Sequence, residues 1–259
     1  MNRSLDSQPQ QRAVRAAAVK REVIVLAAVA LTAAAGGSHK VVRKTAALDF
    51  SYGWPAEAVA IQALDMRLYK DARAKLAEAQ KNAAEDQAMA RKQKREFNQH
   101  FYSVDWEAAG QTPRLLSLQS ENGSFEGGAH PNTSYDVLLW DRAFNRAVSM
   151  TSLFARPAGF AATTRAVYCK KLSAERTRRR EGEKLDLPEF NQCPKYADLA
   201  ISPVDGNKNG RFDRMEFVAS PYVAGPYVEG KYEVLVPVTA KFIAALKPDY
   251  RGSFEAQRQ

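Results

Sequence analysis

The chain has 259 residues, enough for one large domain or two small ones with a substantial hydrophobic core. Apolar residues make up 45% of it and charged residues 26%, which is ordinary for a soluble globular protein. The net charge is +9, but residues 36–259 hold 33 basic and 27 acidic residues and therefore carry only +6. This mild excess favours anionic partners weakly and does not indicate nucleic-acid binding.

Residues 1–35 have the composition of a secretory signal peptide. An apolar run from Val23 to Ala35 follows four basic residues, which are Arg12, Arg15, Lys20 and Arg21. As a helix this run would be about 20 Å long, short of the roughly 30 Å hydrocarbon core of a bilayer. We therefore predict an exported protein, periplasmic or secreted. The alternative to cleavage is an uncleaved segment that anchors the chain to the inner membrane, its sole predicted membrane contact.

Residues 40–150 are predicted to form an N-terminal α+β subdomain. A short strand, LDFSYGW, stops at Pro55 and precedes a long helix over residues 56–96, whose first half has apolar residues at helical spacing. Alternating apolar residues between 100 and 150 then indicate several strands joined by turns. We expect an antiparallel meander with one covered face.

Residues 151–255 are predicted to form a second α+β subdomain. Its helix runs to about Arg180, and one face of it carries Phe160, Thr164, Val167, Tyr168 and Leu172. Strands follow on either side of residues 205–210 and again in YEVLVPV, and TAKFIAALKPDY closes the chain with helical spacing. The order of elements predicts an α+β fold with antiparallel sheets packed against two main helices.

The two cysteines, Cys169 and Cys193, lie 24 residues apart on either side of a charged segment. In an exported protein such a pair favours a disulfide, with two buried free thiols as the alternative. Closing a loop of this size stabilises the fold by about 3 kcal/mol in the chain-entropy model.

The segment DGNKNGRFDRME has oxygen-bearing side chains at the spacing of a calcium loop, namely Asp205, Asn207, Asn209, Asp213 and Glu216. A helix–loop–helix calcium site needs a helix on each side, but both flanks contain proline and the upstream flank has the apolar alternation of a strand. We therefore predict a β-hairpin turn here, with bound calcium as the alternative. No other cofactor is indicated.

Catalytic motifs are scarce in this sequence. The three histidines are His39, His100 and His130, and the chain has no GxSxG, SxxK or HExxH motif. A hydrolase that pairs His100 with His130 is the weakest of the functional hypotheses, and we do not expect an enzyme.

The segment SPYVAGPYVEG is predicted to form a stiff aromatic loop through Pro221, Tyr222, Gly225, Pro226 and Tyr227. Tyrosines in such a loop supply a large contact area at a small loss of entropy, which suits recognition of a partner. The alternative is a rigid connector whose tyrosines cover the core.

Two further stretches carry a family resemblance. They are EGGAHPNTSYDVLLWD, followed by SLF, and FVASPYVAGPYVEGKYEVLVPV, followed by FIAAL. Together they resemble the RsiV-like and PdaC-like family of paired extracytoplasmic domains, found in a lysozyme-responsive anti-sigma factor and beside peptidoglycan deacetylase domains. The likeness spans roughly residues 45–250. It implies an α+β envelope protein that binds rather than catalyses, with residues 220–230 and Gly127, Gly128 and His130 as the first surface to test.

These observations lead to two main hypotheses. The first is a binding module for peptidoglycan or another anionic envelope polymer, or for a lysozyme-like protein. The charge of +6 favours the anionic polymer, because lysozymes of animals are basic and would be repelled unless acidic residues cluster locally. The second is a structural or stress protein of the envelope that acts through protein partners. The sequence carries over neither deacetylation nor anti-sigma activity, since no deacetylase domain is present and only about twenty residues precede the apolar run.

Overall fold

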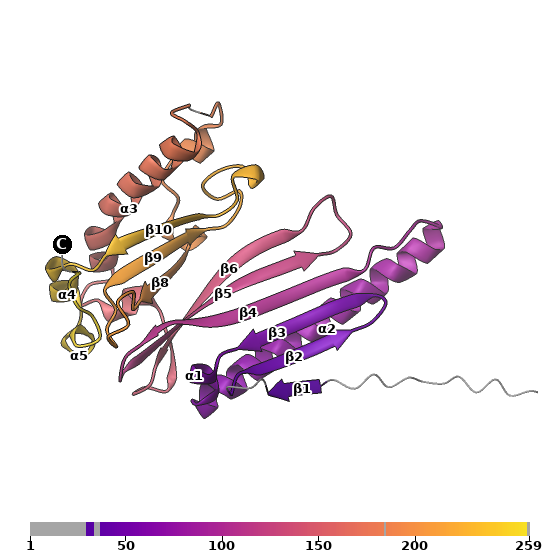
Figure 1. Cartoon of the computed structure of the whole chain (residues 1–259), viewed down its shortest axis with the longest axis horizontal. Helices are drawn as coiled ribbons and strands as arrows, with labels where there is room; N and C mark the ends of the chain where they lie inside the picture. Colours follow the sequence, from indigo (N-terminus) through magenta and orange to yellow (C-terminus); the bar gives the residue numbers. More distant parts are fainter. Residues whose placement is uncertain (1–29, 34–36, 184, 258–259) are drawn as a thin grey trace, which may run out of the picture.

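The computed structural model describes residues 30–33, 37–183 and 185–257 (Figure 1). Residues 1–29 and 34–35 of the predicted export segment lie outside the described residues. Between them, Ala30–Ala33 form β1, which pairs in antiparallel register with β2 (His39–Lys44). Among the helices of the described ranges, none combines the length and the apolar character that crossing a bilayer requires.

The N-terminal half forms a seven-stranded sheet with the strands in chain order, covered by one long helix (Figure 1). The helix α2 spans Gln62–Gln93, and apolar residues four or seven apart along it are buried against the sheet. The remaining strands are β3 (Leu48–Trp54), β4 (His100–Gln111), β5 (Leu115–Phe125), β6 (Asn132–Asp141) and β7 (Arg146–Val148).

The predicted helix over residues 56–96 is divided in two. A short helix α1 (Ala56–Val59) ends before Ile61, whose backbone is extended. The break allows the next turn to present Asp65, whose Oδ1 accepts hydrogen bonds from Trp54 Nε1 and lies 2.8 Å from His39 Nδ1. The helix also ends earlier than predicted, because Lys94 adopts a left-handed backbone with φ of 53°.

The expectation of purely antiparallel sheets is wrong at one strand pair. β3 and β4 are parallel, with Leu48 opposite His100 and Gly53 opposite Asp105. Because α2 carries the chain back along the sheet, β4 begins at the same end as β3, as parallel pairing requires. From β4 to β7 the predicted antiparallel meander is confirmed.

The C-terminal half forms a three-stranded antiparallel sheet covered by α3 (Ala158–Arg179). Every fourth residue of α3 from Phe160 to Arg176 is buried, whereas Val167 lies off this stripe and is 39% exposed, contrary to prediction. The predicted closing helix is two short ones. The elements are β8 (Ala200–Val204), β9 (Arg214–Ala219), β10 (Tyr232–Pro237), α4 (Ala240–Ala245) and α5 (Pro248–Arg251).

The two halves pack through β5, whose side chains alternate between two cores. Leu116 and Leu118 join the core beneath α2, whereas Leu115 joins the aromatic core beneath α3. The layers are therefore α2, the large sheet, the small sheet and α3, and the α+β fold class is confirmed.

A buried carboxylate ties the halves together at the end of β6. Asp141 is fully buried and accepts hydrogen bonds from the Arg114 guanidinium at 3.2 Å, the Tyr250 hydroxyl at 2.9 Å and two backbone N–H groups. Burial by itself raises the pKa of Asp141, but these donors outweigh it and hold the pKa below its usual range. The carboxylate thus links the large sheet to α5.

We expect Asp141→Asn to lower the free energy of unfolding by about 3 kcal/mol, because it removes the buried counter-charge of the partly buried Arg114 cation and leaves it only the exposed Asp249 carboxylate, 3.7 Å away. Urea denaturation measures this loss. Asp49→Asn removes an exposed partner of Lys44 and is the control, with no measurable change expected. Equal effects of the two substitutions would contradict the role given to Asp141.

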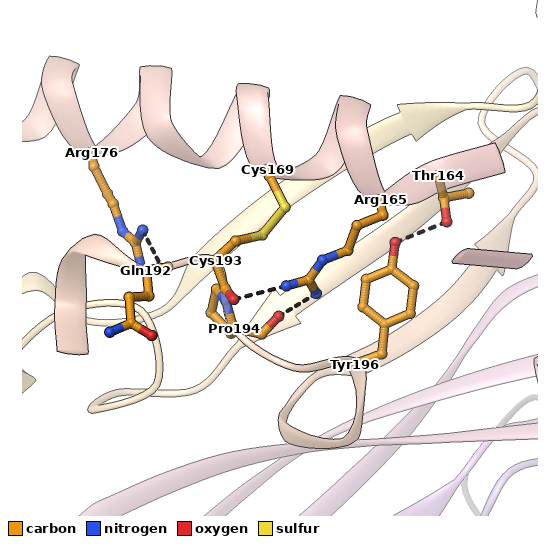
Figure 2. Close-up of a disulfide and its surroundings, with 8 residues drawn as sticks. All are labelled: Thr164, Arg165, Cys169, Arg176, Gln192, Cys193, Pro194 and Tyr196. Atoms are coloured by element: carbon orange, nitrogen blue, oxygen red, sulfur yellow. Dashed lines mark hydrogen bonds between the residues drawn. A yellow bond between two sulfur atoms is a disulfide. The ribbon is translucent and has the colours of Figure 1, made fainter. Parts of the chain in front are cut away.

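The predicted disulfide between Cys169 and Cys193 is confirmed, with a Cα–Cα distance of 5.5 Å. Figure 2 shows it fastening α3 to the segment after residue 191, where Arg165 and Arg176 also donate hydrogen bonds to backbone carbonyls. The bond and the two arginines therefore fix one side of α3 to a stretch that has little regular structure of its own.

Replacing both cysteines by alanine should destabilise the fold by about 3 kcal/mol, since the unfolded chain regains the entropy of a 24-residue loop. Urea denaturation with and without reductant measures the effect. We expect reductant to lower the free energy of unfolding of the wild type by the same amount. Reductant should have no effect on the double-alanine variant.

Candidate binding site

Three aromatic side chains from two distant loops meet at one end of the interface between the sheets. His130, in the β5–β6 loop, stacks on Tyr227, in the β9–β10 loop, with ring centroids 4.1 Å apart. Tyr222 completes the group, 5.6 Å from Tyr227 and with its hydroxyl 3.4 Å from His130 Nε2. We call these three residues the aromatic clamp. The structure thus brings together the histidine and both tyrosines that the sequence singled out.

Glycines and prolines shape the two loops of the clamp. Gly127 has a φ of 80°, and Gly128 has open space around the position of a Cβ. In the other loop, a Cβ on Gly225 would collide with the Glu229 carboxylate. Tyr222 itself has a φ of 70°, an uncommon backbone conformation for a bulky residue, and it leaves the side chain 56% exposed.

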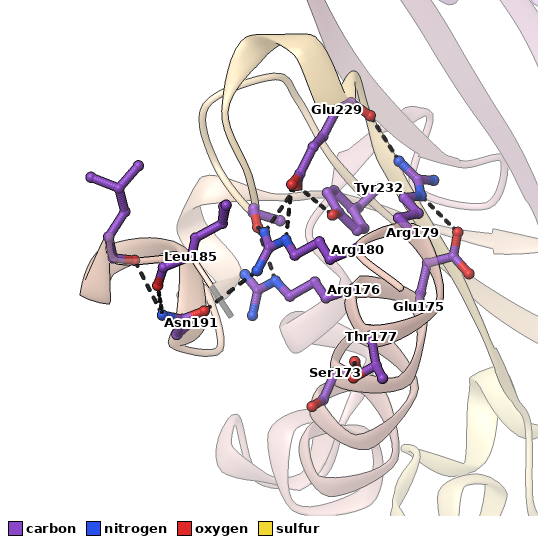
Figure 3. Close-up of polar contacts among 12 residues, drawn as sticks. Ser173, Glu175, Arg176, Thr177, Arg179, Arg180, Leu185, Asn191, Glu229 and Tyr232 are labelled. Carbon is purple, nitrogen blue, oxygen red and sulfur yellow. Dashed lines mark hydrogen bonds and ion pairs between the residues drawn. The ribbon is translucent and has the colours of Figure 1, made fainter. Parts of the chain in front are cut away.

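The loop after β9 is fastened to the C-terminal end of α3 by arginines (Figure 3). Arg180 forms a two-pronged ion pair with Glu229, with N–O distances of 2.8 and 2.9 Å. Arg176 donates to the Ala224 carbonyl at 2.9 Å, and Arg179 donates to the Glu229 and Lys231 carbonyls. The tyrosines of the clamp therefore project from a loop that is held at Ala224 and again at Glu229 and Lys231.

A groove of about 420 Å³ runs between the two sheets and leads toward the clamp. Six carboxylates and one ammonium group line it, which gives it a net negative charge although the protein is basic. We call it the acidic groove. Across the groove, Lys231 Nζ lies 4.9 Å from the centroid of the Tyr135 ring, and Gln119 Nε2 donates a hydrogen bond to Glu216. The charged residues are Asp105, Glu107, Glu121, Asp136, Glu216, Glu233 and Lys231.

The groove is not apparent from the sequence alone, although the alternation along β4 indicates one of its walls. Tyr102, Val104 and Trp106 alternate along β4, which places Asp105 and Glu107 on the other face of the strand. The alternation does not predict which sheet packs opposite β4. That sheet is the small one, and it places Glu216 and Glu233 in the groove beside Asp105 and Glu107.

Glu216 is the most perturbed acid of the groove. Burial, and then the neighbouring Glu233 carboxylate, raise the pKa of Glu216 to about 6. A hydrogen bond from Gln119 opposes the shift without cancelling it. One groove carboxyl therefore changes its charge near pH 6.

Four of the five residues of the alternative calcium loop lie in or beside a turn between two strands. β8 and β9 pair across residues 205–213, so the predicted hairpin is confirmed. Asp205 accepts backbone N–H groups of Asn209 and Gly210, and Asp213 accepts that of Gly206, so both carboxylates stabilise the turn itself. Asn207 and Asn209 donate to Glu255. Glu216 lies away from the turn, in the acidic groove.

The histidine pair suggested for a hydrolase does not form a contact. His100 is buried with its Nε2 3.3 Å from Asp86, whereas His130 is engaged in the aromatic clamp. The predicted alternative in which the two rings act together therefore has no geometric support.

Comparisons with known proteins bear on the same segments. Residues 41–133 match the family model described as Deacetylase PdaC, a stretch that runs from β2 into β6 and includes Gly127, Gly128 and His130. Over these residues the chain is similar to that family. The predicted resemblance to that family is confirmed. No curated protein matches the chain.

A solved structure shares the fold of this protein. A DUF3298 family protein from Pseudomonas aeruginosa PAO1 is 13% identical, with a TM-score of 0.51 over 87% of this chain and 99% of that one. A member of the DUF3298 family from Bacteroides fragilis is also 13% identical, with a TM-score of 0.47 over 80% of this chain and 86% of that one. At this identity the Pseudomonas structure shows the fold alone.

The raised pKa of Glu216 gives a prediction for stability. In the unfolded chain this carboxyl titrates near 4.5, so between pH 4.5 and about 6 the folded state binds more protons. Stability should therefore fall as the pH rises through this window. Glu216→Gln should flatten the slope, whereas Glu57→Gln, outside the groove, should retain it. Urea midpoints measured from pH 4.5 to 7 test this, and parallel curves for wild type and Glu216→Gln would refute it.

Proposed function

We propose that this protein is a non-catalytic binding protein of the bacterial cell envelope, and that its partner is a basic protein of the lysozyme type. The observation that carries the proposal is the acidic groove with the aromatic clamp at one end. The N-terminal segment supports export, and the similarity to the PdaC family agrees with a role at the envelope.

The charge of the groove favours a basic partner, although the net charge of the protein disfavours one. The net charge of +6 on residues 36–259 would repel a basic protein, but six carboxylates and one lysine line the groove. Within the described residues, only Asp105 among the six also pairs with a lysine outside the groove, Lys40 at 3.8 Å. Local complementarity of this kind steers association and fixes orientation, even where the overall charges have the same sign. A basic side chain entering the groove would also relieve the crowding of Glu216 and Glu233.

The clamp supplies the second half of a protein-binding surface. Interfaces concentrate their binding energy in tyrosine, tryptophan and arginine, surrounded by residues that exclude water. Tyr222 is 56% exposed, and Val228 beside the clamp is 88% exposed, so apolar area is available for a partner. Because arginines hold the loop, little entropy is lost when a partner binds.

The clamp also favours a second candidate, a glycan chain of the cell wall. Exposed aromatic rings offer flat apolar faces, and the His130 and Tyr227 rings stack to form an extended surface. Such a ligand would use the clamp and gain nothing from the carboxylates of the groove.

Titration calorimetry with an animal lysozyme as the probe tests the proposal. The triple variant Glu107→Gln, Glu121→Gln, Asp136→Asn should lower the affinity at least tenfold and weaken its dependence on salt. Tyr222→Ala and Tyr227→Ala should each cost about 1–2 kcal/mol of binding free energy, or roughly tenfold in affinity.

A control variant separates the groove from total charge. Glu57→Gln, Glu78→Gln and Glu85→Gln remove the same three charges from α1 and α2 and should leave binding unchanged. Equal weakening by both triple variants would reduce the effect to bulk charge. No binding of lysozyme, together with saturable co-sedimentation with insoluble peptidoglycan that Tyr227→Ala abolishes, would replace the protein partner with the glycan.

A further inference from the structure

Arg176 is a buried cation whose hydrogen bonds are incomplete. It lies one turn before the end of α3 and is 6% exposed. Its Nε donates to the Ala224 carbonyl and its Nη1 to the Gln192 carbonyl, each at 2.9 Å. Its Nη2 is buried and has no hydrogen-bond partner within the described residues, and no carboxylate there forms an ion pair with it (Figure 3).

A second guanidinium lies beside it and has only one counter-charge to share. Arg180, one turn further along, has a side chain that is 7% exposed and is ion-paired with Glu229. Burial, and then the charge of Arg180, lower the pKa of Arg176. The remaining nitrogen of Arg180, Nη1, reaches only Asn191 Oδ1, at a long 3.4 Å. Within the described residues, Glu229 is thus the one carboxylate that forms an ion pair with either of the two buried guanidinium groups. Arg176 Nη2 makes no hydrogen bond there, and Arg180 Nη1 makes only a long one.

Both arginines line a cavity of about 420 Å³ between the end of α3 and the segment that follows it. The cavity is separate from the acidic groove and has no residue in common with it. Its lining is rich in hydrogen-bond donors and contains a single carboxylate. The residues are Ser173, Arg176, Thr177, Arg180, Gly182, Glu183 and Asn191.

We propose that this cavity binds a small oxyanion, of the phosphate class, through Arg176 and Arg180. A phosphate oxygen would accept the unused Arg176 Nη2–H and take the place that Asn191 Oδ1 fills weakly beside Arg180 Nη1. Water could accept the same hydrogen bond, but only an anion also offsets the second buried charge. Guanidinium groups suit this ligand, because their planar donors pair with two oxygens at once.

The site has a structural link to the aromatic clamp but does not rest on the proposed function. Arg176 and Arg180 are the same side chains that hold Ala224 and Glu229. A bound anion would therefore fix the two guanidinium groups that hold the loop containing Tyr222 and Tyr227. This holds whatever that loop binds.

The experiment uses inorganic phosphate and the whole exported chain at constant ionic strength. Thermal unfolding should show a saturable rise in Tm at millimolar phosphate that chloride does not produce, since a ligand of the folded state stabilises it by mass action. Glycerol phosphate is the second probe. A rise with both probes indicates a site open to a phosphate carried on a larger molecule, and a rise with phosphate alone indicates the free anion.

Matched variants locate the site. Ser173→Asp places a carboxylate in the cavity, one turn before Arg176, and should weaken phosphate binding at least tenfold, whereas Ser173→Asn, with the same shape and no charge, should bind as the wild type does. Arg176→Gln should also lose the response. Arg165→Gln removes an arginine that bonds to the same segment from outside the cavity, and it should keep the response.

The outcomes are distinct. If Arg176→Gln fails to fold, the two Ser173 variants decide. An equal phosphate response in Ser173→Asp and Ser173→Asn overturns the proposal, as does a wild-type Tm that rises no more with phosphate than with chloride. Because these measurements involve no partner protein or glycan, their failure would leave the function proposed for the groove and clamp untouched.

Discussion

The buried Asp141 carboxylate fastens the end of β6 to α5, and the proposed binding surface depends on that junction. The carboxylate accepts hydrogen bonds from Arg114, Tyr250 and the backbone. Close packing continues beside it, where Gly110 in β4 allows the backbone of Asp205 to approach. Further along, the sheets diverge and the space between them becomes the acidic groove. The two halves are therefore in close contact near Asp141 and stand apart at the acidic groove.

The groups that hold the aromatic clamp in place lie outside the proposed binding surface. Arginines at the C-terminal end of α3 hold the loop of the tyrosines through the Ala224 carbonyl and the Glu229 carboxylate, and the disulfide fixes the neighbouring segment to the same helix. Across the interface, the Tyr227 hydroxyl donates to the Pro131 carbonyl. Tyr222, in a left-handed backbone conformation, keeps its ring exposed. An arrangement of this kind is preorganised, so that a partner need not order the loop in order to bind it.

Local patterns predicted most of the elements and the composition of the clamp. Strand alternation located β4 to β7, and the PY pairs identified the loop whose tyrosines meet His130. The parallel pairing of β3 with β4 was not predictable in this way, because each strand has the same alternation whichever direction its neighbour runs. The break at Ile61 was hidden by continuous helix-forming residues on both sides. It follows from tertiary contacts of Asp65 with His39 and Trp54.

The parallel pair also sets the order in which the chain can assemble. Strands β4 to β7 are joined by short turns, whereas β3 must wait for residues 55–99 to fold back as helices before it finds β4. Until then the backbone groups along one side of β4 lack their partners. During folding this unpaired edge is open to pairing with a second chain. The long helix α2 therefore serves as the connection whose folding seals that edge.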